Sequence, residues 1–242
     1  MIEFTMYDCT ALTTFLKGIR DASDTVTFNI SKENITCQTF SRGNTSMFHI
    51  IFDRDYFEVY TIDQPDRCVI NVDDVFKILK TVKQSDYVLF QFENYTLNIT
   101  IEGDRRRVFT LSLFDDYDSV RDLPRMSFDV HANLKVQTLL DCIKDLEIMS
   151  SPTIELKTED NNLSVVGEGG YSGNVLSSLT SAEGEGKAHY NISMFKDVLD
   201  FKSISENVEL AYSSDMPITF KFSEDNVSLT TLLAPYISKE DL

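Results

Sequence analysis

Hydrophobic residues recur at helical spacing in four segments of the chain, two in each half. In the first segment they follow the i, i+3, i+4, i+7 pattern that gives a helix one buried face, and they are Leu12, Phe15, Leu16 and Ile19. The predicted inward positions are Val72, Val75, Phe76 and Leu79 in the second segment and Leu139, Leu140, Ile143 and Leu146 in the third. We therefore predict helices over residues 10–22, 72–83, 134–147 and 193–202.

Between these helices the pattern changes to short alternating segments separated by turn residues, which is typical of strands in antiparallel sheets. In the first half we predict strands over residues 25–30, 35–40, 45–52, 87–92, 97–102 and 108–113. In the second half we predict them over residues 153–156, 163–166, 174–179, 188–192, 208–212, 218–222 and 228–233. The order helix, strands, helix, strands thus occurs twice, which predicts a duplicated α+β domain.

The stretch 114–128 separates the two halves. It is acidic, has no apolar period, and contains Leu123-Pro124, a pair that resists both helix and interior strand. We predict an N-terminal domain over residues 1–113, a connecting loop over 114–127 and a C-terminal domain over 128–242.

The composition is that of an ordinary globular protein, with 42% hydrophobic and 25% charged residues in 242. No apolar run approaches the roughly 18 residues that a membrane span needs, and the first residues lack the features of a signal peptide. We therefore expect an intracellular protein without a membrane partner, which would lie in the cytoplasm if the host is archaeal and in the nucleus if it is eukaryotic or viral. The four cysteines lie far apart in sequence, which favours reduced thiols over a metal site or disulfides.

The net charge of −17 argues against nucleic-acid binding, but the charge is unevenly distributed. The four predicted helices hold nine Lys and Arg against eight Asp and Glu, whereas the rest of the chain holds 13 basic and 31 acidic residues. If the helices share one face of the protein, that face is the least acidic one. The alternative is that these lysines only lie on solvated helix faces, as lysines commonly do.

No motif in the sequence predicts catalysis. The three histidines have no metal-ligand spacing, and the glycine-rich stretches 167–173 and 184–187 depart from the phosphate-binding patterns. The acidic pairs Asp73-Asp74 and Asp115-Asp116 leave open a Mg²⁺-dependent nuclease as an alternative, although acids are favoured in the first turn of any helix. We predict a protein that is not an enzyme and needs neither cofactor nor metal.

Three short motifs resemble those of sliding clamps of the proliferating cell nuclear antigen (PCNA) family. They are Leu233-Ala234-Pro235-Tyr236-Ile237 near the C-terminus, Asp215-Met216-Pro217 upstream of it, and Leu123-Pro124 in the connecting loop. The repeated domain pattern and the long acidic connector extend the resemblance over the whole chain. Its implication is a ring-forming, duplicated clamp domain with two helices per domain packed on antiparallel sheets.

The resemblance implies that three chains close head to tail around duplex DNA, with the helices lining the hole. The strand at about 107–113 would pair with the strand 173–179 of the neighbouring chain. Such a ring would serve as a processivity factor for DNA polymerase and would also dock a flap endonuclease and a DNA ligase. An ATP-driven clamp loader would open it.

Carried over to this sequence, the DNA-binding residues form a basic collar without sequence preference. They are Lys17, Arg20, Lys77, Lys80, Lys83, Arg105, Arg106, Arg107, Lys144, Lys196 and Lys202. The three arginines have the alternative of a merely exposed turn. Asp141, Asp197 and Asp200 thin the collar in the second half, so weak intrinsic affinity for DNA is expected.

The resemblance also implies a pocket that takes a short peptide motif of each partner. Its walls would be Phe40, Thr45, Met47, Leu123, Pro124, Pro217, Leu232, Ala234, Pro235 and Ile237. For Phe40 and Met47 the alternative is a place in the core of a strand. Tyr236 stands where the family commonly has Lys or Arg, which leaves one partner contact open.

Other functions stay open at this point. The chain has the features of one subunit of a heterotrimeric or checkpoint clamp, or of a viral processivity factor that acts as a monomer. A protein-interaction scaffold without DNA is the remaining alternative, and the lysines on the helices count against it.

Overall fold

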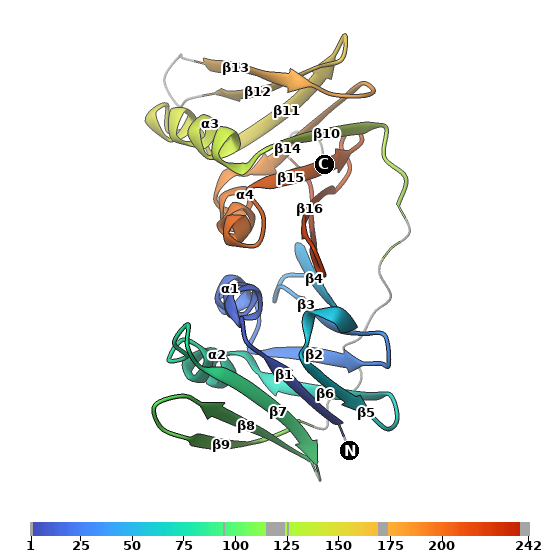
Figure 1. The fold of residues 1–242 in the computed structure, drawn as a ribbon. Coiled ribbons are helices and arrows are strands. Elements are labelled where there is room, and N and C mark those ends of the chain that lie inside the picture. Colours follow the sequence, from blue (N-terminus) through green and yellow to red (C-terminus); the bar gives the residue numbers. More distant parts are fainter. Residues whose placement is uncertain (1, 94, 115–123, 125, 169–173, 238–242) are drawn as a thin grey trace. The chain divides into compact units, whose positions relative to one another are not determined.

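The computed structural model describes residues 2–93, 95–114, 124, 126–168 and 174–237 (Figure 1). The chain forms two compact units. Unit 1 comprises Met1–Asp122 with Glu224–Leu229, and unit 2 comprises Leu123–Ser223 with Thr230–Leu242. The main division therefore falls inside the predicted connecting loop.

Unit 1 contains two antiparallel sheets and two helices. One sheet has the order β5-β1-β7-β8-β9, and the strands β4-β3-β2-β6 follow one another in the other. The helices are α1 (Thr10–Ile19) and α2 (Val72–Leu79), with a short 3-10 turn, η1 (Arg54–Tyr56). The strands are β1 (Ile2–Met6), β2 (Thr25–Ile30), β3 (Asn34–Phe40), β4 (Ser46–Asp53), β5 (Val59–Ile62), β6 (Asp66–Asn71), β7 (Tyr87–Glu93), β8 (Thr96–Glu102) and β9 (Arg107–Ser112).

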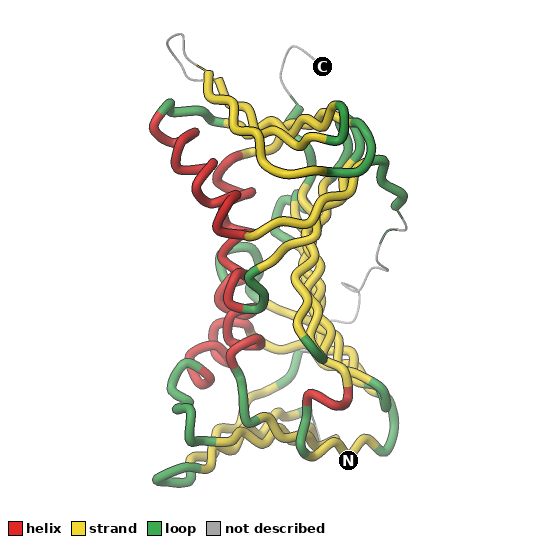
Figure 2. The backbone as a smooth tube through the Cα atoms, turned by 45° about the horizontal axis from the view of Figure 1, so that its top comes forward, coloured by secondary structure: helices red, strands yellow, loops and turns green. Residues whose placement is uncertain are grey.

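Unit 2 repeats this plan. One sheet has the order β13-β12-β11-β14, and β10, β15 and β16 pair in that order in another. The helices are α3 (Val136–Ile148) and α4 (Ile192–Leu199), and α4 continues into a 3-10 turn, η2 (Asp200–Ser203). The strands are β10 (Val130–Lys135), β11 (Thr153–Glu159), β12 (Asn162–Glu168), β13 (Asn174–Ser181), β14 (Gly186–Asn191), β15 (Asn207–Tyr212), β16 (Ile218–Glu224) and, with residues in both units, β17 (Val227–Leu233). In each unit the helices lie together on one side of the strands (Figure 2), so the predicted α+β duplication is confirmed.

The second helix of each unit begins in the same way. Asn71 precedes α2, and its side-chain oxygen accepts a hydrogen bond of 2.9 Å from the backbone N–H of Asp74. Asn191 precedes α4 and accepts one of 3.1 Å from the N–H of Met194. Each asparagine satisfies an N–H that has no partner within the helix, which fixes where the helix starts.

The predicted apolar stripe of α1 is buried in full, at 1% exposure or less. In α2, however, Phe76 is half-buried and Ile78 takes a core position instead. In α3, Leu140 is half-buried, and the core positions include Val136 and Cys142. These inward predictions for Phe76 and Leu140 were wrong because both residues lie at the edge of the apolar stripe.

The predicted start of the third helix at Leu134 was also wrong. Leu134 and Lys135 belong to β10, where they lie opposite Val208 and Asn207 of β15. The strands β1, β5, β6 and β10 were not identified from the sequence. Each is short and is defined by pairing with a distant segment.

Aromatic rings fill much of both cores. Phe4 stacks on Phe90 with ring centroids 4.9 Å apart and meets Phe57 edge-on at 5.1 Å. In unit 2, Phe195 and Phe220 meet edge-on at 4.8 Å. Such pairs add packing specificity to the hydrophobic effect.

All four cysteines are buried free thiols: Cys9, Cys37, Cys68 and Cys142. Burial raises the pKa of Cys9 and of Cys68 to about 12 and also raises the pKa of Cys37 and Cys142. No helix in the described part of the chain is long and apolar enough to cross a membrane.

Candidate nucleic-acid interface and partner surface

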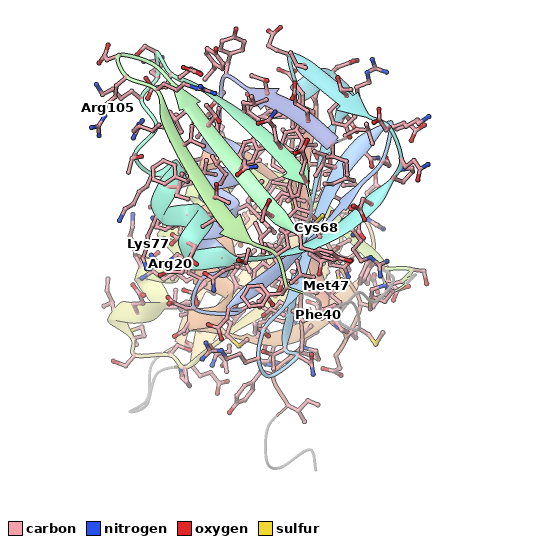
Figure 3. All side chains as sticks on the ribbon, turned by 90° about the horizontal axis from the view of Figure 1, so that it is seen from below. Arg20, Phe40, Met47, Cys68, Lys77 and Arg105 are labelled. Carbon is pink, nitrogen blue, oxygen red and sulfur yellow. The ribbon has the colours of Figure 1, made fainter. Side chains whose placement is uncertain are left out.

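Asp73 joins the two helices of unit 1. Its Oδ1 accepts hydrogen bonds from Arg20 at the end of α1, 2.9 Å from Nε and 2.8 Å from Nη2. Its Oδ2 lies 2.5 Å from Nζ of Lys77, one turn further along α2. These two predicted DNA-binding cations thus share one carboxylate. Figure 3 labels both of them, Arg20 and Lys77. The Lys77 ammonium, more than any other group, holds the pKa of Asp73 below its usual value.

Phe76 carries two cations of the same surface. The guanidinium carbon of Arg20 lies 4.7 Å from the centre of its ring, and Nζ of Lys80 lies 5.9 Å from it. Both distances are within the range of cation–π attraction. Phe76, half-buried at the edge of the apolar stripe of α2, thus contacts both cations.

The three arginines at the basic turn between β8 and β9, Arg105, Arg106 and Arg107, have different environments. Arg105 is exposed and, as Figure 3 shows, lies at the tip of the hairpin, apart from Arg20 and Lys77. Arg106 Nε lies 2.8 Å from Oε1 of Glu102 and is also exposed. Lys83 is close by and pairs with Asp104 at 2.8 Å.

Arg107 points into unit 1. Only 19% of its side chain is exposed, and its Nη2 lies 3.1 Å from Oδ2 of Asp86, whose side chain is 3% exposed. It also donates hydrogen bonds to the hydroxyl and the carbonyl of Thr81, at 2.8 and 3.4 Å. Both terminal nitrogens of Arg107 thus have partners within the unit, and its role in DNA binding stays a prediction.

In unit 2 two of the three predicted cations are also paired. Lys144 lies 2.7 Å from Asp141 on the same helix. Lys196 of α4 lies 2.5 Å from Glu147 of α3, so this pair joins α3 to α4 as Arg20 and Asp73 join α1 to α2. The exposed Lys202 lies in η2.

Four predicted cations have no carboxylate within 4.0 Å among the described residues. They are Lys17, Lys80, Arg105 and Lys202, and all four are exposed. The sequence therefore predicted which basic residues occupy the helices but not which of them carry free charge. The Asp73–Lys77 pair was detectable as an i, i+4 spacing, whereas the Arg20–Asp73 contact spans 53 positions and has no local signal.

The pocket residues of unit 1 lie around the β3–β4 hairpin. Phe40 and Met47 lie opposite each other across these strands (Figure 3). Phe40 is half-buried and Thr45 exposed, but Met47 is 3% exposed. Met47 therefore matches the alternative of a core strand residue and offers little surface to a partner.

In unit 2 the pocket residues are Pro217, directly before β16, and residues of the last strand and the segment that follows it. Pro217, Leu232, Ala234 and Pro235 are half-buried, and Ile237 is 60% exposed. The N–H of Tyr236 donates a hydrogen bond of 2.7 Å to the carbonyl of His189 on β14, which attaches the tail to the sheet. Tyr190 reinforces the nearby turn because its hydroxyl donates to the carbonyl of Met216 at 3.0 Å. Pro124 is exposed, and Leu123 lies outside the described residues.

The strands that the resemblance assigns to the ring contact are both edge strands. β9 ends the five-stranded sheet and β13 ends the four-stranded sheet. Leu113 donates a hydrogen bond of 2.9 Å to the carbonyl of Tyr95 beside β9. Because hydrogen-bonded and non-hydrogen-bonded pairs alternate in an antiparallel ladder, Thr110, which faces Asn98, directs its backbone N–H away from β8.

The described residues contain no group of three or more His, Cys, Asp or Glu side chains that would hold a metal ion. Asp73, named for the nuclease alternative, is occupied by Arg20 and Lys77, and Asp115-Asp116 lies outside the described residues. His189 lies 2.7 Å from Glu155, and burial lowers the pKa of His49.

A family model described as "Proliferating cell nuclear antigen, N-terminal domain" matches residues 1–116. A curated relative, a DNA polymerase sliding clamp from Methanothermobacter thermautotrophicus, is 24% identical over 245 residues, covering 100% of each chain. The chain is similar to PCNA-type sliding clamps along its whole length.

Solved structures of the family have the same fold. PCNA from Thermococcus kodakaraensis superimposes with a TM-score of 0.88 at 18% identity, over 98% of this chain and 100% of that one. The PCNA of A. fulgidus, solved with the C-terminal region of FEN-1 bound, gives 0.88 at 17% identity, over 99% of this chain and 100% of that one. The duplicated clamp fold predicted from the sequence is confirmed.

Proposed function

We propose that this protein is a sliding clamp that encircles duplex DNA, acts as a processivity factor for DNA polymerase and docks other replication and repair enzymes. The observation that carries the proposal is the similarity to DNA polymerase sliding clamps along the whole chain, together with the clamp fold in both units. The protein does no chemistry of its own in this role. A topological link to DNA takes the place of a tight binding site.

The exposed cations of the helices would face the DNA. Lys17, Lys80 and Lys202 have no carboxylate within 4.0 Å among the described residues, so they have charge to offer to phosphates. Contacts to phosphates fix no sequence, which suits a ring that must move along the duplex. The acidic remainder of the surface would repel DNA.

Partners would dock through a short peptide motif, as the FEN-1 region bound to the A. fulgidus PCNA suggests. The proposed surface combines Phe40 of the β3–β4 hairpin with Pro235 and Ile237 of the tail. The exposed Ile237 would supply apolar area, and the Tyr236–His189 hydrogen bond would hold the tail in place. A DNA polymerase, a flap endonuclease, a DNA ligase and a clamp loader are the partners that we propose.

We also propose that three identical chains form the ring. The edge strands β9 and β13 would pair between neighbouring chains and complete each other's sheets. The alternatives are a heterotrimeric or checkpoint clamp and a viral processivity factor that acts as a monomer.

Light scattering over a dilution series combined with a retention assay tests this function. Three chains of 27.6 kDa give about 83 kDa, and this mass should persist on dilution. Protein loaded on a nicked circular duplex should stay bound at high salt and should be released when the circle is cut. A persistent monomer would contradict the homotrimer, and release from the intact circle would contradict encirclement.

A further inference from the structure

Asp73 holds cations from both helices of unit 1. One carboxylate oxygen accepts two hydrogen bonds from Arg20, and the other lies 2.5 Å from the Lys77 ammonium. The side chain of Asp73 is 41% exposed, so this cluster lies at the surface where an approaching polyanion would meet it.

The guanidinium of Arg20 already has a partner along one edge and another on its flat face. Its Nε and Nη2 are bound to Asp73, and the flat face of its guanidinium lies 4.7 Å from the centre of the Phe76 ring. A phosphate competes for the same N–H donors that a carboxylate takes, because both groups offer two negatively charged oxygens that accept charge-assisted hydrogen bonds. DNA must therefore displace Asp73 or use the donors that Asp73 leaves free.

We propose that Asp73 is a built-in counterion that competes with DNA phosphates for Arg20 and Lys77 and so weakens the hold of the helix face on the duplex. This inference rests on the proposed function, since it assumes that α1 and α2 face DNA. The inference concerns how tightly the clamp binds DNA. It also changes the expected role of Arg20 and Lys77, because Asp73 already binds both. Asp73 balances one of their two positive charges before DNA arrives.

Unit 2 repeats the arrangement with different residues. Glu147 of α3 accepts Lys196 of α4, so here too one carboxylate joins the two helices by holding a predicted collar cation. A weak grip suits a ring held on DNA by topology, because each phosphate contact that must be broken slows movement along the duplex.

The salt dependence of DNA binding tests the proposal, with Asp73→Asn and Asp74→Asn as matched variants. Both remove one negative charge from the first turn of α2, but Asp74 has no cation within 4.0 Å among the described residues. Affinity for a fluorescent linear duplex would be measured by anisotropy between 50 and 200 mM salt for both variants and the wild type, conditions over which phosphate contacts dominate. Circular dichroism and light scattering would verify that each variant keeps its fold and mass.

Asp73→Asn should bind several-fold more tightly at the lowest salt and should steepen the plot of log affinity against log salt by up to about 2 per chain, since each freed cation that contacts a phosphate adds about 0.9. Asp74→Asn should change the slope less, because Asp74 forms no ion pair within 4.0 Å among the described residues and acts on Lys77 only at longer range. Equal slopes for the two variants, or weaker binding by Asp73→Asn, would overturn the proposal.

A double variant gives an independent check. Lys77→Gln should have a smaller effect in the wild type, where Asp73 competes with phosphates for the lysine. In the Asp73→Asn background it should remove part of the gained slope, so the two effects should not add. Additive effects would count against the counterion role. A wild-type protein that is not retained on circular DNA would instead refute the proposed function itself, a result that the retention assay reports separately.

Discussion

Arg105 and Arg107 stand two positions apart in one basic turn, yet they have different environments. Arg105 is exposed at the tip of the β8–β9 hairpin. Arg107 is largely covered and is bound to Asp86, which is itself 3% exposed. A charge pair removed from water depends on both partners, because either one alone would be left uncompensated.

Arg107→Gln should therefore destabilise the protein by about 3 kcal/mol, the cost of leaving a buried carboxylate without its partner. Urea unfolding followed by circular dichroism would measure it. Arg105→Gln is the matched control and should leave the unfolding midpoint nearly unchanged while weakening binding to duplex DNA. Equal midpoints for the two variants would show that the Arg107–Asp86 pair contributes nothing.

The sequence predicted residue types well and residue environments less well. The stripe Leu12, Phe15, Leu16 and Ile19 is buried as expected because helical periodicity is a local property. The fate of Arg107 depends on Asp86, which lies 21 positions away, and that of Arg20 on Asp73 in another helix. Such contacts depend on how the elements pack, so no local sequence pattern predicts them.

The second helices of the two units share one device for starting, the asparagines Asn71 and Asn191. Each asparagine ends a strand and caps the helix that follows directly. This abrupt change from strand to helix is specified by one side chain in each unit. It is also direct structural evidence of the duplication.

Replacing either asparagine by alanine should cost about 1 kcal/mol of stability, the usual price of losing an N-cap side chain. The variants Asn71→Ala and Asn191→Ala would be compared by urea unfolding. Asn71→Asp and Asn191→Asp are the controls and should retain stability, since aspartate caps equally well and suits the positive end of the helix dipole. Losses as large in the aspartate variants would point to crowding instead of capping.

Elements could be predicted where the hydrophobic period extends over many residues. They were missed where pairing with a distant strand defines the element. All four helices were found, with ends displaced by a few residues. The last two residues of β10, Leu134 and Lys135, were merged into α3, although pairing with β15 makes them part of a strand. β1, β5 and β6 are likewise defined by partners distant in sequence.

At the scale of the whole molecule, β9 and β13 each leave one side of a sheet open among the described residues. Thr110 directs its N–H outward from β9, so it can donate to another chain without disturbing the pairing with β8. The pocket for partner peptides and the ring remain predictions at this scale, because both depend on more than one unit or chain.

Thr110→Pro should shift the protein from trimer to monomer, because proline has no N–H to donate across the edge while an edge strand tolerates its backbone. Light scattering at micromolar concentration would measure the mass. Thr110→Ala keeps the N–H and removes the same hydroxyl, so it should stay trimeric. A trimeric proline variant with wild-type stability would mean that the ring forms through another surface.

The four native thiols have one practical consequence for studying this protein in motion. All are buried, and burial raises the pKa of each, so the reactive thiolate is scarce at neutral pH. Maleimide dyes should therefore react little with the native cysteines. A single cysteine introduced on the surface would accept one fluorophore per chain without any native cysteine being replaced, and single-molecule tracking on stretched DNA would then report the protein's diffusion directly.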